Sequence, residues 1–466
     1  MIAISHEKES DWSGASIFIK DAVFETPFET GVEYSSPARG PWNIVHTGML
    51  MPESHQIFVC AQSCLRGVVL TAAEMNAEER FSTITIEEHN ILDGDMEKLI
   101  IDGVADILHK LPVRPRAILL FTSCIHHFVG CDLRYVYDTL HKQFPDIDIT
   151  DCYMNPTMRK TLTPPDVKMR QQLYSVLHET SIRDNGINFI GNNFPTLLDG
   201  ELGLLLQQQG CIVRDICTSK TYDEFQKMAQ SKVNITTNPA AFLAGETISK
   251  RFGTKHLVMP LSYDYDEINA ALSQLYLLLS EKKVQNISAK DSLSSSCIDC
   301  AALAHDADKA LAKTAELLGT TQIAIDYTAT SRPLGLAKLL LTHGMNVTAV
   351  YADNFISSEK NDFDFLKNNF PMLRLYATVH PKMAILPAQE KSYALHDSPS
   401  DGSFTLAIGQ KAAYFTGTRH FVNMIEANGF WGYSGISHLM ELIQDAYKNE
   451  KDTAKIIQVK GWGCCA

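Results

Sequence analysis

The 466-residue sequence lacks the features that define several large protein classes. No apolar run reaches the roughly 18 residues that a membrane-spanning helix needs, and the N-terminus shows no basic segment followed by an apolar one, as a signal peptide would. Positive charge is in deficit, with 41 Lys and Arg against 54 Asp and Glu and a net charge of -13, which argues against a nucleic-acid-binding surface. We therefore expect a soluble cytoplasmic protein that binds neither nucleic acid nor membrane.

Two nucleotide-binding motifs are also missing. No G-x-G-x-x-G follows a predicted first strand, and no G-x-x-x-x-G-K-[ST] occurs. Neither a dinucleotide nor ATP therefore has its usual phosphate-binding loop in this chain.

What the sequence does contain is an alternation of short β-rich runs with longer amphipathic segments, which predicts α/β architecture with parallel sheets. At about 150 residues per domain, the length suggests three domains. We predict Rossmann-like domains over residues 1–175, 176–290 and 291–466, with a helix at 94–111, a crossing loop at 156–171 and a boundary at 288–300. The predicted strands are 56–61, 82–86, 116–124 and 147–153; 187–192, 211–217, 233–238 and 256–260; and 321–328, 346–353, 373–379 and 404–409.

Cysteine is well represented, with 11 residues, and without an export signal these should be reduced thiols or metal ligands. Cys60 and Cys124 fall at the carboxyl ends of predicted strands in one domain, where open α/β sheets bind ligands. Cys64 lies four residues beyond Cys60, where a helix would begin. Grouped thiolates suit soft metals and iron–sulfur clusters. The alternative is that these cysteines are small buried hydrophobic residues.

Several stretches of the sequence match motifs of one known family in order and spacing. They are VCAQSCLRG (59–67), TIEEHNILDGDMEKLIIDGV (85–104), TSCIHHFVGCDL (122–133), DYTATSRPLGLAKLLLTHGM (326–345) and FWGYSG (430–435). Together they resemble the component 1 proteins of the nitrogenase superfamily. By this resemblance Cys124 takes a ligand position, Gly130 and Asp132 match, and Cys131 replaces an aspartate. In the third domain, Arg332 belongs to a matching Arg-Pro turn.

The resemblance implies a dimer, either a homodimer or a heterodimer with a homologous subunit, and an iron–sulfur cluster, [4Fe–4S] or larger, near the subunit interface. Electrons would come from a separate ATP-hydrolysing iron protein that docks transiently. The expected cluster ligands are Cys60 and Cys124, joined by Cys64, with Cys131 as a further candidate. His126 and His127 should point to opposite sides of the element that holds them. Each should pack against its neighbours or contact the cluster ligands without binding metal itself.

The sequence also departs from the family. No cysteine precedes Cys60, and the aligned position falls near Gly40. The two ligands of the dinitrogenase metal cofactor correspond to Asn238 and Gly429, which cannot hold a soft metal. We therefore do not expect a dinitrogenase catalytic subunit, and any second metallocofactor stays unidentified.

Arg332 follows a predicted strand and opens a helix, where backbone N–H groups favour anions. We predict that it contacts a carboxylate of the substrate or cofactor; the alternative is a surface ion pair.

Two further cysteine pairs carry weaker signals. Cys297 and Cys300 form a C-x-x-C at a predicted helix start, where a thiol pKa is lowered, but a linker with incidental thiols explains them as well. Cys464 and Cys465 could reach the cluster of a partner subunit or lie in a frayed terminus.

These observations favour an iron–sulfur reductase component that reduces a tetrapyrrole, a C–S compound or another small molecule. The alternative is a non-catalytic scaffold on which a complex iron–sulfur cofactor is assembled. A binding protein of the periplasmic type is opposed by the missing export signal and by the cysteine pattern.

Overall fold

The structure, a computed structural model, describes residues 14–29, 31, 33, 44–158, 161, 163–280, 298–384 and 404–452. Over these residues the chain forms three sheets and divides into two compact units. The two-sheet unit comprises residues 40–195 and 211–260, and the six-strand unit comprises residues 1–39, 196–210 and 261–466. The predicted α/β class with parallel sheets is confirmed.

The first sheet, in the two-sheet unit, has the order β3-β2-β4-β5, and all its strands run parallel. Strands β2 and β4 are buried at every position, as expected for strands covered by helices on both faces. Successive side chains alternate between the faces. The strands are β2 (Ser54–Cys60), β3 (Phe81–Thr85), β4 (Ala117–Ser123) and β5 (Asp148–Met154).

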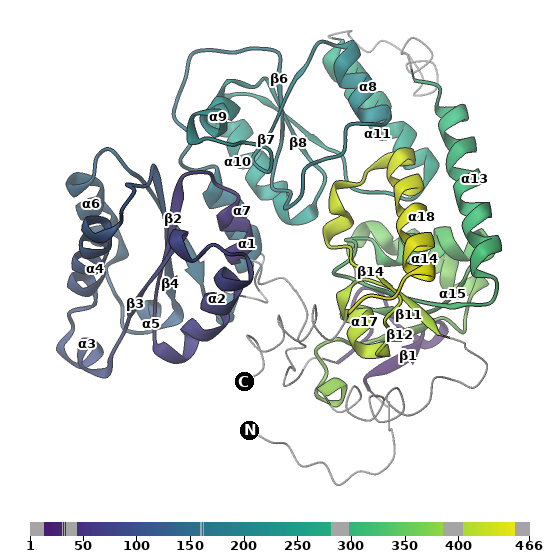
Figure 1. Ribbon diagram of the computed structural model, residues 1–466, viewed down its shortest axis with the longest axis horizontal. Coiled ribbons are helices and arrows are strands. Elements are labelled where there is room, and N and C mark those ends of the chain that lie inside the picture. The colour runs from purple at the N-terminus through teal and green to yellow at the C-terminus, as the bar shows by residue number, and fades with distance from the viewer. Residues whose placement is uncertain are drawn as a thin grey trace. The chain divides into compact units, whose positions relative to one another are not determined.

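Two apolar cores cover the two faces of this sheet. The α2-side core includes Phe58, Cys60 and Phe121, and the α4-side core includes Ile57 and Val59. Figure 1 shows α4 and α6 on one side of the sheet, and α1, α2 and α7 on the other. The helices are α1 (Ile44–Met49), α2 (Gln62–Glu74), α3 (Glu88–Asp93), α4 (Met96–Lys110), α5 (Cys124–Phe128), α6 (Leu133–Gln143) and α7 (Pro165–Leu173).

The second sheet belongs to the same unit and has the parallel order β7-β6-β8-β9. The α2-side core continues into it through residues such as Ile190, Phe225 and Ile248. Its elements are β6 (Gly186–Phe189), β7 (Ile212–Asp215), α9 (Tyr222–Gln226), β8 (Val233–Thr236), α10 (Phe242–Phe252) and β9 (Lys255–Val258).

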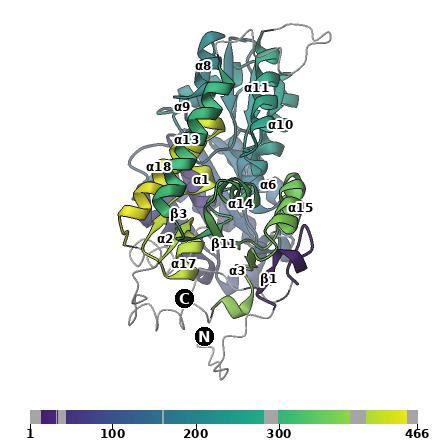
Figure 2. The same ribbon diagram turned by 90° about the vertical axis from the view of Figure 1, so that its right-hand side faces the viewer.

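The third sheet, in the six-strand unit, has the order β1-β12-β11-β10-β13-β14 and is parallel except for β1, which pairs antiparallel with β12. Helix α14 packs beside β11 and α15, and α17 packs against β10 and β13 (Figure 2). The strands are β1 (Ser16–Phe18), β10 (Gln322–Asp326), β11 (Asn346–Tyr351), β12 (Arg374–Tyr376), β13 (Thr405–Ile408) and β14 (Phe421–Val422); the helices are α8 (Glu201–Gln208), α11 (Tyr265–Leu279), α13 (Cys300–Leu318), α14 (Pro333–Thr342), α15 (Lys360–Asn369), α17 (Gln410–Thr416) and α18 (Gly432–Lys448).

Short 3-10 turns complete the secondary structure. They are η1 (Ile19–Asp21), η2 (Glu78–Arg80), η3 (Pro156–Met158), η4 (Lys227–Gln230), η5 (Pro239–Ala241), η6 (Ser357–Glu359), η7 (Pro381–Ala384) and η8 (Glu426–Gly429).

Every strand predicted from the sequence overlaps an observed one, and the predicted helix 94–111 is α4. The crossing loop predicted at 156–171 is wrong in its second half, because α7 begins there with Pro165 in its first turn, where the missing N–H costs nothing. Most of the predicted boundary 288–300 lies outside the described residues, and the predicted domain limits stay predictions. No helix in the part of the chain that the structure describes is long and apolar enough to cross a membrane.

Candidate metal centre

Cys60 and Cys124 lie at the carboxyl ends of neighbouring strands of the first sheet. Cys60 is the last residue of β2, and Cys124, the first residue of α5, directly follows β4. The two strands pair in parallel with Val59 opposite Thr122, which brings Cys60 level with Ser123. The two cysteines therefore lie at the same edge of the sheet on neighbouring strands, while their role as ligands stays a prediction.

Cys64 joins them from the first turn of α2. Its backbone N–H donates to the carbonyl of Ala61 at 2.9 Å, and its side chain is exposed, whereas Cys60 is fully buried. Burial, with contributions from Cys64 and Cys124, raises the pKa of Cys60 to about 12, because a neighbouring negative charge disfavours a second thiolate. Cys64 and Cys124 therefore each lie within electrostatic reach of Cys60.

These thiols fit an iron–sulfur cluster better than a single metal ion. Over the described ranges, no group of three or more His, Cys, Asp and Glu side chains converges on one ion position. The thiolates of a cluster bind different irons, so they surround the cluster and need not meet at a point. Iron would favour the thiolate form of Cys60, since a coordinated thiol is deprotonated outright; without metal, burial and, to a smaller extent, Cys64 and Cys124 raise the pKa of this thiol.

Cys131 is tied to a different part of the domain. It lies in the turn between α5 and α6 and packs against the α4-side core. Burial, reinforced by the nearby carboxylate of Glu97 in α4, raises the pKa of Cys131 to about 12. Glu97 also accepts the backbone N–H of Asp132 at 2.6 Å. Cys60 belongs to the core on the other face of the sheet, so Cys131 and Cys60 have different surroundings.

The two histidines of this segment have different surroundings. His126 is buried, and its Nδ1 accepts the backbone N–H of Ser123 at 3.1 Å at the start of α5. Burial lowers the pKa of His126. His127 is exposed, with its ring stacked on Tyr153 at 6.2 Å between centroids. Both contacts agree with a packing role.

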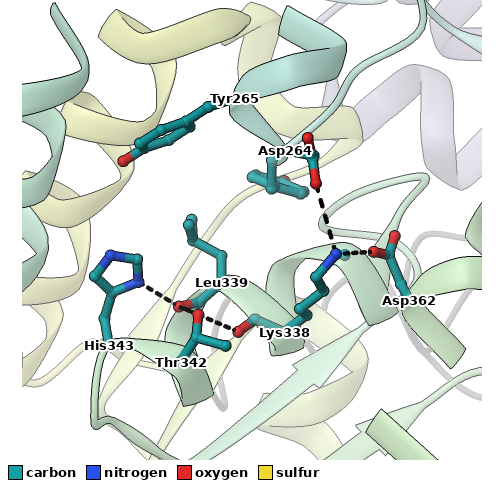
Figure 3. Close-up of a pocket in the computed structure, with 9 residues that line it drawn as sticks. Asp264, Tyr265, Lys338, Leu339, Thr342, His343 and Asp362 are labelled. Carbon is teal, nitrogen blue, oxygen red and sulfur yellow. Dashed lines mark hydrogen bonds and ion pairs between the residues drawn. The ribbon is translucent and has the colours of Figure 1, made fainter. Parts of the chain in front are cut away.

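Arg332 lies in the six-strand unit at the start of α14, in the predicted turn. Its guanidinium is buried and forms ion pairs with Glu267 and with Asp362, the latter at 2.9 Å from Nη2. The ammonium of Lys338 donates to the other oxygen of Asp362 at 3.0 Å and lies 3.6 Å from Asp264 (Figure 3). The structure thus gives Arg332 a buried ion-pair network in place of the surface pair that was the alternative. A ligand carboxylate would have to displace one of these partners.

A pocket of about 180 Å³ lies beside this network. On one side Lys338 is neutralised by two carboxylates. On another, the hydroxyl of Tyr265 donates to Asp308 at 2.7 Å, and His343 lies 3.5 Å from the same carboxylate. These polar groups engage one another and do not single out a ligand class. The lining residues are Tyr263, Asp264, Tyr265, Gly335, Lys338, Leu339, Thr342, His343 and Asp362.

Neither position that corresponds to a ligand of the dinitrogenase cofactor carries a metal-binding side chain. Asn238 uses its side-chain oxygen to accept the N–H of Ala240 at 3.0 Å, at the start of η5. Gly429 has a φ of 78° and ends a left-handed stretch that starts at Glu426. That stretch is anchored by the N–H of Ala427, which donates to the carbonyl of Ala329 at 2.7 Å.

The remaining cysteines lie away from this edge or outside the described residues. Cys152 is fully buried within β5, Cys211 directly precedes β7, and Cys217 donates to the carbonyl of Asn192 at 3.2 Å. Cys300 opens α13 in the six-strand unit, but the lowered thiol pKa predicted for this helix start is wrong for it, because burial raises the pKa of Cys300. The predictions for Cys297, Cys464 and Cys465 fall outside the described residues.

Comparison with known proteins identifies the family. Residues 45–448 match the family model described as "Nitrogenase component 1 type Oxidoreductase". The chain belongs to this family. Among solved structures, it is similar to "Nitrogenase Cp1 at pH 6.5", with 15% identity and a TM-score of 0.60 over 92% of this chain and 95% of that chain. It is also similar to "Nitrogenase Cp1 at pH 5", with 12% identity and a TM-score of 0.58 over 94% of each chain. No curated protein matches it.

The nitrogenase component 1-like fold predicted from the sequence is therefore confirmed, and the family is one of oxidoreductases. Sequence reasoning missed Glu97, the carboxylate near Cys131. The two residues are far apart in the chain, and no motif spacing links them. Only the contact between α4 and the turn after α5 brings them together.

Proposed function

We propose that this member of the nitrogenase component 1 type family is the reductase component of an electron-transfer system, and that Cys60, Cys64 and Cys124 hold its iron–sulfur cluster, [4Fe–4S] or larger. The observation that carries the proposal is the convergence of three thiols on one carboxyl edge of a parallel sheet, where ligands of α/β folds bind. Membership in an oxidoreductase family supports it. Cys131 is left out because it packs against the α4-side core, whereas Cys60 belongs to the core on the other face of the sheet.

The chain's own residues set the position and the surroundings of the cluster. When bound, the cluster supplies one-electron transfer. Strands β2 and β4 fix the spacing between Cys60 and Cys124, and the buried Cys60 keeps water from one side of the site. Cys64 is exposed, so the opposite side is open to a partner. Arg332 is not assigned to the substrate, because Glu267 and Asp362 engage its guanidinium.

The proposed partners follow from what the chain lacks and from its family. Electrons come from an ATP-hydrolysing iron protein that docks transiently, a partner that the family supports and with which the missing phosphate-binding loop in this sequence agrees. The chain works as a homodimer or with a homologous subunit. The substrate is a small reducible molecule or a tetrapyrrole.

A scaffold for assembling a complex iron–sulfur cofactor is the second candidate. It is favoured by the absence of a cysteine or histidine at positions 238 and 429, where Asn238 and Gly429 cannot anchor a resident metal cofactor. A scaffold would hold its cargo only until transfer and would need no permanent ligand at these positions.

A turnover experiment separates the two candidates. The anaerobically purified protein is mixed with an iron-protein partner, ATP and a panel of tetrapyrroles and C–S compounds, and re-oxidation of the iron protein is followed. A reductase gives substrate-dependent re-oxidation that is lost in Cys124→Ser and retained in the matched control Cys211→Ser. Stoichiometric transfer of a cluster to another protein without turnover would establish the scaffold and contradict the reductase.

A further inference from the structure

His126 has one ring nitrogen that is hydrogen-bonded and one that is not. It is the third residue of α5, the helix that begins at Cys124, and it is 1% exposed. Its Nδ1 accepts the backbone N–H of Ser123 at 3.1 Å and so caps the helix. A neutral imidazole that accepts through Nδ1 carries its hydrogen on Nε2. Within the described residues, this Nε2 is buried and has no hydrogen-bond partner.

A packing role does not account for this second nitrogen. Leaving a buried donor unpaired costs its full desolvation free energy, so such groups are rare in folded proteins. His55 of the same sheet shows the usual arrangement, because it is 3% exposed and its Nε2 lies 2.8 Å from the hydroxyl of Ser82. The capping contact explains Nδ1 of His126 but gives Nε2 no function.

The ring of His126 lies at the edge of the sheet where the cysteines meet. Ser123 is the last residue of β4 and is level with Cys60 of β2. Because Nδ1 contacts the backbone N of Ser123, the ring is held against the end of β4, and Nε2 is one ring width away. The neighbouring strand β5 is followed by Asn155, whose Oδ1 is also buried without a partner. Two of the seven such atoms in the described residues thus flank Cys124.

The sulfur atoms of an iron–sulfur cluster accept N–H hydrogen bonds, and these bonds help to set its reduction potential. We propose that Nε2–H of His126 donates to a sulfur of the cluster at Cys124, an inference that rests on the proposed function. His126 is then a positioning residue that raises the reduction potential, because reduction adds negative charge to the sulfurs. It does not bind iron, since ligation through Nε2 would move the ring hydrogen to Nδ1 and break the bond from Ser123.

Two substitutions separate the two ring nitrogens. His126→Asn keeps an acceptor near the place of Nδ1 and removes the donor at Nε2, whereas His126→Gln keeps a donor near Nε2 and removes the acceptor. The full-length protein is purified without oxygen, and its cluster is titrated potentiometrically with EPR detection. We expect a more negative potential in His126→Asn and a potential close to that of the unaltered protein in His126→Gln. His127→Asn, at the exposed neighbouring position, is the matched control and should leave the potential unchanged.

A second measurement needs no variant. The unaltered protein, grown with 15N-labelled histidine, is reduced and examined by pulsed EPR in H2O and in D2O. We expect a weak 15N coupling and a proton coupling that disappears in D2O, because a hydrogen-bonded ring couples more weakly than a ligating one.

The contrary outcomes are distinct. Equal potentials in His126→Asn and the unaltered protein would overturn the inference. Equal shifts in His126→Asn and His126→Gln would also overturn it, since the helix cap alone would then explain them. If His126→Asn loses its cluster, pulsed EPR decides, and a missing histidine coupling or one as strong as that of a ligand overturns the inference. These results leave the proposed function standing, whereas absence of iron from the unaltered protein would overturn both.

Discussion

The carboxylate of Glu97 accepts the backbone N–H of Asp132 at 2.6 Å, which ties the turn after α5, next to Cys131, to the first turn of α4. Thiols react as thiolates, and the pKa of Cys131 is raised to about 12 by burial and by Glu97. We therefore expect slow alkylation of Cys131 in the iron-free protein at neutral pH. Glu97→Gln removes the negative charge and lowers that pKa, and each unit of lowering accelerates alkylation by up to about tenfold.

Timed iodoacetamide labelling with peptide mass spectrometry measures this rate. Cys64 is the internal control, because it is exposed and lies away from Glu97, so its rate should be the same in both proteins. Equal rates for Cys131 with and without the Glu97 carboxylate would contradict the influence of that carboxylate on the thiol.

The Asp362 carboxylate is the centre of the ion-pair network in the six-strand unit. It is 4% exposed and accepts hydrogen bonds from Arg332 and Lys338. Removing one partner of a buried pair costs about 3–5 kcal/mol, and we expect a loss of that size for Asp362→Ala in urea unfolding followed by circular dichroism. Glu267→Ala is the matched control, with a smaller loss expected because the Glu267 side chain is 47% exposed. Equal losses of unfolding free energy in the two variants would contradict the expectation that the more buried carboxylate contributes more to stability.

Glu359 gives the six-strand unit a stability that falls as the pH rises. Its carboxyl group is fully buried and accepts the N–H groups of Leu334 at 2.8 Å and Gly335 at 3.3 Å. Burial raises the pKa of Glu359 from 4.5 to about 8. Since the folded pKa exceeds the unfolded one, this contribution is full below pH 4.5 and is lost as the pH rises through 8, by roughly 5 kcal/mol at most.

Glu359→Gln keeps an acceptor for the two amides and removes the titration. The variant should therefore gain stability relative to the unaltered protein as the pH rises across this window, as measured by urea midpoints at several pH values. Parallel pH profiles for the two proteins would exclude Glu359 as the titrating group.

His55 has the opposite effect in the two-sheet unit. It is buried, with Nε2 2.8 Å from the hydroxyl of Ser82, and burial, assisted by Arg80, lowers its pKa from 6.5 to about 4. The folded pKa lies below the unfolded one, so this contribution is present above pH 6.5 and is lost as the pH falls through 4, by roughly 3 kcal/mol at most. His55→Gln should flatten the acid limb of the stability profile, and an unchanged acid limb would rule out His55.

The strands and the edge on which Cys60 and Cys124 meet could be predicted from the sequence, because buried parallel strands are continuous apolar runs and their carboxyl ends share one side of the sheet. The surroundings of Cys131 and Arg332 could not be predicted from the sequence. Their neighbours, Glu97 and Asp362, come from other helices, and contacts between helices distant in the chain leave no periodic signal. Helix α7 was missed because its prolines read as loop residues.

Iron and sulfide analysis of the anaerobically purified protein and its cysteine variants tests the central claim most directly. The account predicts iron and sulfide in the unaltered protein, a large loss of both in Cys60→Ser combined with Cys124→Ser, and retention of both in the matched control Cys211→Ser. The iron and sulfide content of the double variant is interpreted only if circular dichroism shows that the variant is folded. Otherwise Cys64→Ser combined with Cys124→Ser replaces it. Iron content unchanged in a folded double variant would contradict the assignment of this sheet edge as the cluster site.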